Sequence, residues 1–495
     1  MGLIRFKVHD SQPISQEKAE RAYMSGHDRV PWPSETYWTG EMVVMKRPVE
    51  DSGNFYIPWY VEGFGELILG TATLRQREAP YNLHVELARG KINQVRNQTY
   101  DWQSIGLHVP DRLTERIKSA VTLFSKAATN QHDPEVCVEA ADQALVIALE
   151  ATELLASCFA DQALAARHRQ DQQLGTLLGA NFGDHLVDDF TARQFRNSFN
   201  SVIIPFNWRQ IESQEGQYDW AIPDKQVEWG ETNGLTIWGG PLVFLSESGL
   251  PDWLLQWKDD FSTLMTFVSD YIETTVARFR DRINLWECAA KTNVSQALGL
   301  NEEQRLRLTV RAIETVRRVD PNAEYLITVD QPWAEYMKNN EWELSPIHFA
   351  DALARAELGL SGVNLQINVG YLPGGSPQRD LLELSRLLDL WGFLGLPLYI
   401  SLTFPTSDAE DPNAYGKDKP IPNGMHEGWS PISQRAWVEK VIPLILAKRN
   451  VYGIFWNQLS DGQPHEYPHG GLFNSEGRPK PALATLATMR KYHLK

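Results

Sequence analysis

The sequence predicts an α/β protein: a (β/α)8 TIM barrel over residues 173–495, preceded by a small β domain and a helical hairpin. The first observation is that short apolar runs alternate with amphipathic segments of helical period from Leu177 onward, as in that barrel. The second is that 495 residues leave room for two or three domains. The third is a composition of 42% apolar and 22% charged residues, which is typical of globular proteins.

The charge and the cysteine content narrow the class of protein. The net charge of −16, from 47 basic and 63 acidic residues, argues against a nucleic acid or an anionic membrane as partner. Three scattered cysteines do not suggest a disulfide framework. The N-terminus has no apolar signal segment, and we find no uncharged apolar run of membrane-spanning length. We therefore expect a cytoplasmic protein, with an oligomer possible.

Residues 1–108 show short runs typical of β-strands, separated by glycine and proline. These features predict a β-sandwich-like N-terminal domain. Small β modules beside hydrolase barrels often bind carbohydrate, so a binding role here is an analogy at the level of the fold. The predicted strands are Glu41–Met45, Asn54–Tyr60, Gly65–Leu74 and Asn82–Leu87.

Residues 109–172 change to helical periodicity. Leu113, Ile117 and Val121 recur at a spacing that places them on one helix face. Asp133 followed by Pro134 is typical of a helix start, with Asp133 as N-cap, and a long apolar-faced segment follows. The sequence therefore predicts a helical hairpin that links the β domain to the barrel.

The barrel strands are predicted from the apolar runs between residues 177 and 456. Helices are expected between them, for example Phe261–Arg280 and Glu302–Val319, the latter with Asn301 as N-cap. The predicted strands are Leu177–Asn181, Ser201–Pro205, Leu235–Val243, Ile283–Glu287, Tyr325–Val329, Gly362–Ile367, Leu396–Leu402 and Val451–Trp456.

Several short stretches carry a resemblance to a known family. The fourth predicted strand reads Trp286-Glu287-Cys288-Ala289-Ala290-Lys291, the sixth reads Gly362-Val363-Asn364-Leu365-Gln366, and the chain closes with Arg478-Pro479-Lys480-Pro481-Ala482. Together with Glu215-Gly216-Gln217-Tyr218-Asp219-Trp220 and Gly453-Ile454-Phe455-Trp456, they resemble glycoside hydrolase family 10, the xylanase family. The resemblance implies a (β/α)8 barrel that binds oligo- or polysaccharide, with active-site residues at the C-terminal strand ends.

The catalytic positions depart from the family pattern. The resemblance implies a retaining mechanism, in which two Glu side chains lie about 5–5.5 Å apart. In the matched register, Lys291 stands at the acid/base position and Leu402 at the nucleophile position. Changes at the matched sugar-contacting positions, among them Leu245, indicate a rebuilt subsite. The side chains expected to line it are Asn207, Trp208, Lys291, Gln366, Asn368 and Trp456.

Four other acidic residues are candidates for a relocated catalytic pair. Glu247, Asp330 and Asp461 follow predicted strands and should reach the barrel mouth. Glu287 is expected deeper in the barrel, where a carboxylate is ordinarily paired with Lys or Arg. An inverting pair would require a separation of about 6.5–9.5 Å between two of them.

Metal and cofactor chemistry is not expected. His465-Glu466-Tyr467-Pro468-His469 matches a zinc-protease pattern, but Pro464 and Pro468 oppose the helix that this motif requires. We find no phosphate-binding loop, dinucleotide fingerprint or paired Cys-x-x-Cys. The sequence therefore predicts neither a metal site nor a cofactor.

Three hypotheses of function follow, and whether the protein is an enzyme stays open. The first is a xylanase-like carbohydrate-binding pseudoenzyme, in which amides and aromatic rings line a cleft without a retaining carboxylate pair. The second is an active O-glycosyl hydrolase with relocated carboxylates. The third is a non-enzymatic scaffold protein, in which side chains such as Leu245 and Leu402 fill the cleft.

Overall fold

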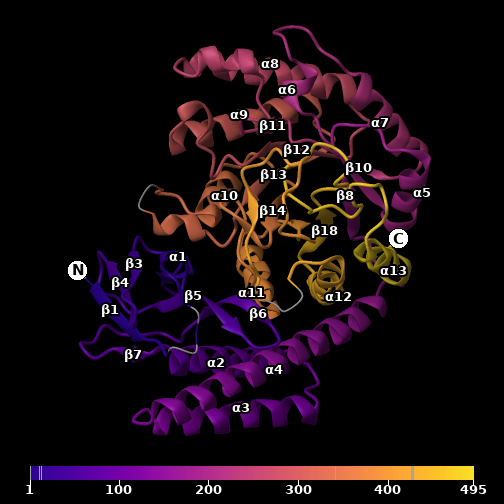
Figure 1. The fold of residues 1–495 in the computed structure, drawn as a ribbon. Coiled ribbons are helices and arrows are strands. Elements are labelled where there is room, and N and C mark those ends of the chain that lie inside the picture. Colours follow the sequence, from indigo (N-terminus) through magenta and orange to yellow (C-terminus); the bar gives the residue numbers. More distant parts are fainter. Residues whose placement is uncertain (1, 10–11, 13, 340–341, 425–427) are drawn as a thin grey trace.

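A computed structural model describes residues 2–9, 12, 14–339, 342–424 and 428–495. Figure 1 shows a barrel formed by the C-terminal part of the chain, with the N-terminal strands at its side. Long helices that follow these strands run along the same side of the molecule and lead into the barrel. The order of a small β part, helices and a barrel agrees with the predicted fold class.

The N-terminal β part consists of two small sheets. One sheet has the strand order β3-β4-β1-β7 and the other β2-β5-β6. Phe6 and Phe55, from different sheets, stack with ring centroids 4.1 Å apart, so the two sheets share one hydrophobic core. The elements are β1 (Gly2–Lys7), α1 (Gln16–Glu20), β2 (Tyr23–Ser25), β3 (Glu35–Trp38), β4 (Met42–Arg47), β5 (Asn54–Val61), β6 (Gly65–Gly70) and β7 (Tyr81–Asn82).

The prediction of a strand at Asn82–Leu87 is wrong, because these residues begin helix α2 (Leu83–Ser104). The side chain of Asn82 accepts a hydrogen bond from the backbone N–H of Val85, which is the N-cap arrangement. Leu83 and Leu87 then lie buried on one helix face. The β part is therefore shorter than residues 1–108, and the predicted helical hairpin has a third helix.

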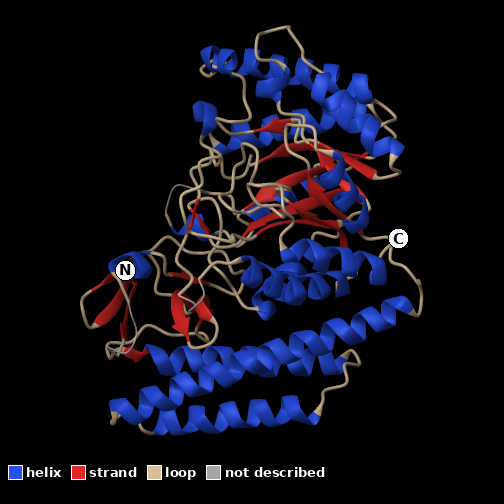
Figure 2. Ribbon diagram, turned by 45° about the vertical axis from the view of Figure 1, so that its right-hand side comes forward, coloured by secondary structure: helices blue, strands red, loops and turns tan. Residues whose placement is uncertain are grey.

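Helices α3 (Asp111–Thr129) and α4 (Pro134–His168) form the predicted hairpin, and α2 also packs against α4. Asp133 is the N-cap of α4, since its side chain accepts a hydrogen bond from Val136 N–H at 3.3 Å. By length and composition alone α4 could cross a membrane, but it packs along α2, α3 and the barrel (Figure 2), as core helices of the same composition do.

The described strands of the barrel sheet are parallel and follow the order β10-β9-β8-β18-β16-β14-β13-β12. The sheet closes because β10, at one end of this order, also pairs with β12 at the other end. The strands are β8 (Leu177–Asn181), β9 (Ser201–Ile204), β10 (Thr236–Gly239), β11 (Val243–Phe244), β12 (Leu285–Ala290), β13 (Glu324–Asp330), β14 (Gly362–Asn368), β16 (Leu398–Thr403) and β18 (Val451–Trp456). A separate hairpin joins β15 (Tyr371–Leu372) to β17 (Lys419–Pro420).

The predicted third strand, Leu235–Val243, is interrupted, and β10 and β11 lie on either side of the break. Gly240 is at this break and has φ of 134°, a conformation that favours glycine. A Cβ atom at this position would lie 2.7 Å from both Cβ and the carbonyl oxygen of Glu287. The interruption therefore brings the backbone of the third strand against Glu287.

Helices surround the barrel and cover the outer side of the strands. Asn301 caps α9 together with Gln304 in a capping box, as predicted for this helix. The elements are α5 (Asp189–Ser198), α6 (Trp208–Ile211), α7 (Ala221–Thr232), η1 (Asp252–Trp257), α8 (Phe261–Phe279), η2 (Ala297–Gly299), α9 (Glu302–Val319), η3 (Glu335–Lys338), α10 (Pro346–Arg355), α11 (Leu381–Gly392), α12 (Pro431–Ala447) and α13 (Pro481–His493).

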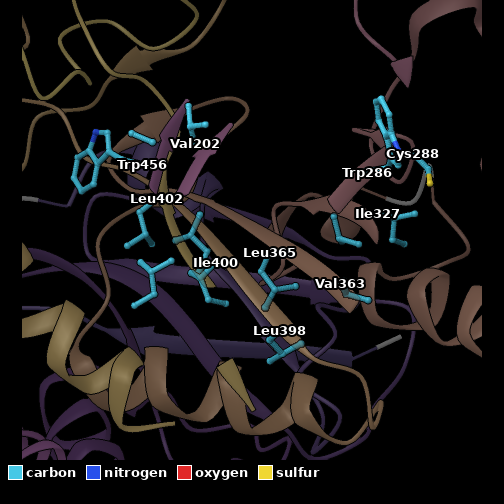
Figure 3. Packing of buried hydrophobic residues seen from close by; sticks show 14 of the residues in the cluster. Val202, Trp286, Cys288, Ile327, Val363, Leu365, Leu398, Ile400, Leu402 and Trp456 are labelled. Carbon is cyan, nitrogen blue, oxygen red and sulfur yellow. The ribbon is translucent and has the colours of Figure 1, made fainter. Parts of the chain in front are cut away.

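Alternate residues of the barrel strands face opposite sides. Leu365, Ile400 and Leu402 belong to the large hydrophobic core shared with the outer helices (Figure 3). A separate cluster that includes Trp238 and Tyr399 lies inside the barrel, toward the N-terminal ends of the strands. Polar residues of the same strands lie inside the barrel between this cluster and the C-terminal strand ends, where the candidate site begins.

The N-terminal part is fastened to the barrel by buried polar contacts. Lys91 of α2 forms an ion pair with Asp380 at 2.5 Å, and both side chains are buried. Arg379 donates a hydrogen bond to the Tyr23 hydroxyl at 2.9 Å. Leu382 of α11 lies in a hydrophobic cluster with residues of α2, α3 and α4. The two parts therefore form one continuous structure.

Candidate functional site

A cavity of about 150 Å³ enters the barrel at the C-terminal ends of the strands. It reaches from the loops that follow the strands down to Glu287 and Trp238 inside the barrel. A wider groove of about 910 Å³ adjoins it, and Asn207 and Tyr415 line both. Binding sites of (β/α)8 barrels lie at this end of the strands, so the cavity and groove are the candidate ligand site.

Glu287 lies at the inner end of the cavity, and two side chains donate hydrogen bonds to it. Trp238 Nε1 donates to Oε2 at 3.0 Å, and the Thr328 hydroxyl donates to Oε1. The Thr328 oxygen accepts from Asn364 Nδ2 at 3.0 Å, and Asn364 Oδ1 accepts from Ser401 at 3.1 Å. In this series of hydrogen bonds each group donates in the direction of the Glu287 carboxyl, which is therefore the final acceptor.

The expectation that Glu287 pairs with Lys or Arg is wrong for the part of the chain that the structure describes. Its carboxyl is buried, and its hydrogen-bond partners there are Trp238 and Thr328. Burial raises the pKa of Glu287 to about 7, while the two hydrogen bonds act in the opposite direction. A buried carboxyl without a cation is costly and is typical of functional sites.

Lys291, just beyond β12, lies between two carboxylates at the mouth. Its ammonium forms an ion pair with Glu466 and lies 4.0 Å from Asp330 Oδ2. Burial lowers the pKa of Lys291, but the charges of Glu466 and Asp330 outweigh it and the net shift is upward. Burial raises the pKa of Asp330 to about 7, against the opposing effect of Lys291. Lys291 has φ of 59°, a left-handed conformation that sets its direction.

Tyr467 forms one wall of the cavity and holds two predicted site residues. Its hydroxyl accepts hydrogen bonds from Gln366 Nε2 at 2.7 Å and from Asn368 Nδ2 at 2.9 Å. Asn368 Oδ1 in turn accepts from Asn457 Nδ2 at 3.0 Å. Gln366, Asn457 and Tyr467 line the cavity, whereas Asn368 supports them from behind.

Asp184 and Asn207 lie where the cavity meets the groove. Asp184 accepts hydrogen bonds from Asn207 Nδ2 at 3.0 Å and from Gln210 Nε2 at 2.8 Å. Burial raises the pKa of Asp184, and these hydrogen bonds oppose the shift. Asn207 Oδ1 is buried and has no hydrogen-bond partner among the described residues, so it can accept a donor from a ligand.

Two loops that follow β16 and β18 are joined beside the cavity. His465 Nε2 lies 3.0 Å from Asp411 Oδ2, and the backbone N–H of Tyr415 donates to the His465 carbonyl at 2.9 Å. Residues 465–469, which match the zinc-protease pattern, form part of this loop contact. His465 therefore holds the loops together, and its two nitrogens face Asp411 and the Gln463 carbonyl.

Four predicted site residues lie away from the cavity. Trp208 is buried against Tyr271 and donates to Glu212, and Trp456 is buried and donates to the Gly470 carbonyl. Asp461 is buried in an ion pair with Lys480 at 2.6 Å. Glu247 lines the groove, is largely exposed and pairs with Lys417 at 3.0 Å. The structure therefore does not bring Glu247, Glu287 and Asp461 together.

Leu402, which the family register places at the nucleophile position, faces away from the cavity. Its side chain is fully buried in the core shared with the outer helices (Figure 3). The preceding residue, Ser401, lines the cavity, as strand alternation requires. Leu245 also belongs to the outer core. Neither leucine fills the cavity, which the scaffold hypothesis required.

Asp184, Tyr415, Glu466 and Tyr467 line the cavity but were not predicted as site residues. All four lie in segments that follow barrel strands, the region where such sites are built. Glu466 and Tyr467 lie within the stretch assigned only to a failed zinc motif. A search of every strand-following loop for polar residues would have included them.

The comparisons with known proteins agree with the barrel. Residues 166–326, from the end of α4 into β13, match the sequence model of Glycosyl hydrolase family 10. Over these residues the chain is similar to glycoside hydrolase family 10, and its barrel is xylanase-like. Strands β14, β16 and β18 lie outside the matched residues.

The similarity to individual proteins is partial. The chain is 27% identical over 215 residues to Endo-1,4-beta-xylanase B of Thermotoga neapolitana, which is 42% of this chain and 58% of that protein. It is 26% identical over 145 residues to Endo-1,4-beta-xylanase 3 of Hypocrea jecorina, 27% of this chain and 39% of that protein. The match thus spans less than two thirds of either relative. Native xylanase 10B from Thermotoga maritima has a TM-score of 0.48 at 17% identity, covering 66% of this chain and 97% of that one.

Proposed function

We propose that the protein binds oligosaccharides in the barrel cavity and does not hydrolyse them by the retaining mechanism. The relatives with partial similarity are named as endo-1,4-beta-xylanases, so xylo-oligosaccharides are the first ligands to test. Amide side chains suit sugar hydroxyl groups, and the ring of Tyr415 at the junction with the groove suits an apolar sugar face.

The observation that supports the loss of retaining hydrolysis is the ion pair between Lys291 and Glu466. A retaining enzyme needs two carboxyl groups about 5–5.5 Å apart, one of them free to act as nucleophile. Lys291 occupies the end of the fourth strand and neutralises Glu466, while β16 contributes Ser401 to the cavity. A carboxylate in an ion pair with a buried ammonium is a weaker nucleophile than a free one.

A second candidate is hydrolysis by relocated carboxylates. Glu287 and Glu466 line the same cavity, and a Glu whose pKa is about 7 can act as general acid near neutral pH. This pair differs from the four residues expected from the sequence, because Glu466 replaces Glu247, Asp330 and Asp461 as the second carboxylate.

Calorimetric titration with xylo-, cello- and manno-oligosaccharides, followed by product analysis of each mixture, tests the proposal. The expected result is saturable binding with every oligosaccharide recovered intact. Cleavage that is abolished by Glu287→Gln or Glu466→Gln would replace the proposal with the second candidate. Absence of both binding and cleavage would refute the carbohydrate-binding function itself.

A further inference from the structure

The charges that line the cavity are unusual for a site that binds neutral sugars. Asp184, Glu287 and Glu466 contribute carboxyl groups, and no Lys or Arg is among the described residues that line it. Lys291, behind the lining, balances Glu466, so Asp184 and Glu287 are the lining carboxyl groups without an ion-pair partner among the described residues. The two lining histidines do not offset these charges: His465 lies against the Asp411 carboxylate, and burial lowers the pKa of His185. The cavity therefore repels anions and favours cations.

The inner end of the cavity lacks a positive partner. The hydrogen-bond chain from Ser401 through Asn364 and Thr328 ends on Glu287, and Trp238 N–H can only donate. All the donors thus favour a carboxylate at a buried position that has no cation among the described residues. A ligand that supplies an ammonium group there would complete an ion pair that the protein leaves incomplete.

We propose that the cavity binds a sugar unit that carries a free amine, and that Glu287 receives its ammonium group. This inference rests on the proposed function, since it names the class of sugar that the same cavity selects. The amides of Gln366 and Asn457 remain available for the hydroxyl groups of that unit. The ammonium of Lys291 already lies 5.1 Å from the ring centroid of Phe244 and 5.9 Å from that of Tyr467, so Trp238 is the lining ring that can favour a ligand cation beside Glu287.

The size of the cavity fits a single unit better than a chain. Its volume is about 150 Å³, and the inner end is closed by Glu287 and Trp238. The adjoining groove of about 910 Å³ begins at Asn207 and Tyr415 and can take the following units. The amine-bearing unit would therefore be the end of an oligosaccharide, with the rest of the chain lying in the groove.

Calorimetry on the protein of residues 1–495 tests this inference. The probes are β-1,4-linked glucosamine oligomers, their N-acetylated counterparts, xylo-oligosaccharides of equal length and xylo-oligosaccharides that carry a uronic acid. We expect the glucosamine oligomers to bind about tenfold more tightly than the neutral sugars, and the uronate-bearing sugars more weakly than both. The preference for glucosamine oligomers should decrease as the salt concentration rises.

Two variants separate a direct contact from a general loss of structure. Glu287→Gln should remove the preference for glucosamine oligomers. Glu212→Gln is the matched control, because Glu212 is also buried and also accepts a Trp indole N–H, from Trp208 at 2.7 Å, but does not line the cavity. This control should keep the preference.

The outcomes distinguish this inference from the proposed function. Xylo-oligosaccharides that bind as tightly as glucosamine oligomers would overturn the inference and leave the carbohydrate-binding function intact. Retention of the amine preference in Glu287→Gln would also overturn it. If that variant does not fold, the test is the unaltered protein: tighter binding of glucosamine oligomers that weakens with salt supports the inference, and the absence of this preference overturns it. Failure of every sugar to bind would refute both.

Discussion

Lys291 forms an ion pair with Glu466 and thereby joins the end of the fourth barrel strand to the loop that follows the eighth. The Lys291 side chain is 13% exposed, and Asp330 lies 4.0 Å from its ammonium on another side. One cation thus lies between two carboxyl groups at the mouth of the cavity. Removal of this cation leaves like charges facing each other in a largely buried setting.

Lys291→Met should therefore lower the free energy of unfolding by about 3 kcal/mol, measured by urea denaturation. The double variant Lys291→Met/Glu466→Gln should recover part of this loss, because it also removes the negative charge that Lys291→Met leaves unpaired at Glu466. Equal stability of Lys291→Met and the unaltered protein would show that the ion pair makes no net contribution.

The raised pKa of Glu287 predicts a specific dependence of stability on pH. Its pKa is 4.5 in the absence of perturbation and about 7 in the folded protein, so between these values the folded state binds a proton that the unfolded state has lost. The contribution of Glu287 to stability is thus highest below the unfolded pKa and decreases as the pH rises toward about 7.

Glu287→Gln removes this titration. The stability of the variant relative to the unaltered protein should improve by roughly 2–3 kcal/mol between about pH 5 and about pH 8. Chemical denaturation of both proteins at the two pH values measures the difference. A difference that stays constant with pH would contradict the assignment of the raised pKa to Glu287.

The orientation of β16 can be tested by introducing a carboxylate. Leu402→Glu places a charge in the hydrophobic core and should destabilise the fold by more than about 4 kcal/mol. Ser401→Glu places the same group in the cavity and should be tolerated better. Thermal unfolding of the two variants makes the comparison. A stable Leu402→Glu protein would show that residue 402 faces the cavity after all.

Tyr415 offers a test of the binding surface with little risk to folding, because its side chain is 53% exposed. Tyr415→Ala should weaken oligosaccharide binding by about 1 kcal/mol, roughly fivefold in Kd. Tyr452→Ala is the matched control, since Tyr452 is also 53% exposed but lies near the start of β18, at the opposite end of the barrel. An equal loss in both variants would exclude a specific contact at Tyr415.

The barrel could be predicted because each strand and helix carries its own periodic signal. Residues Glu302–Val319 form a helix with Asn301 as its cap, as predicted. The strand prediction at Asn82–Leu87 failed because a short apolar run fits a strand and a helix start equally well. The hydrogen bond that caps the helix at Asn82 and the buried face of α2 stabilise the helix at these residues.

The site was predicted less well than the fold, for two physical reasons. Strand alternation makes an error of one residue in register decisive, and Leu402 therefore faces the core while Ser401 faces the cavity. Loop residues such as Glu466 reach the site through contacts between distant segments, which a single sequence does not reveal. By contrast, Gln366 and Asn207 were predicted from the resemblance to the family at matched strand positions and do line the cavity.

The buried contact between Lys91 and Asp380 bears on how this protein should be produced for experiments. A fragment that starts after α4 would look like a complete barrel, yet it would leave Asp380 without its ammonium partner and expose Leu382 to water. Expression of the barrel alone is thus expected to yield an aggregation-prone fragment. Failure of such a fragment to bind sugar would reflect the missing helices rather than the cavity.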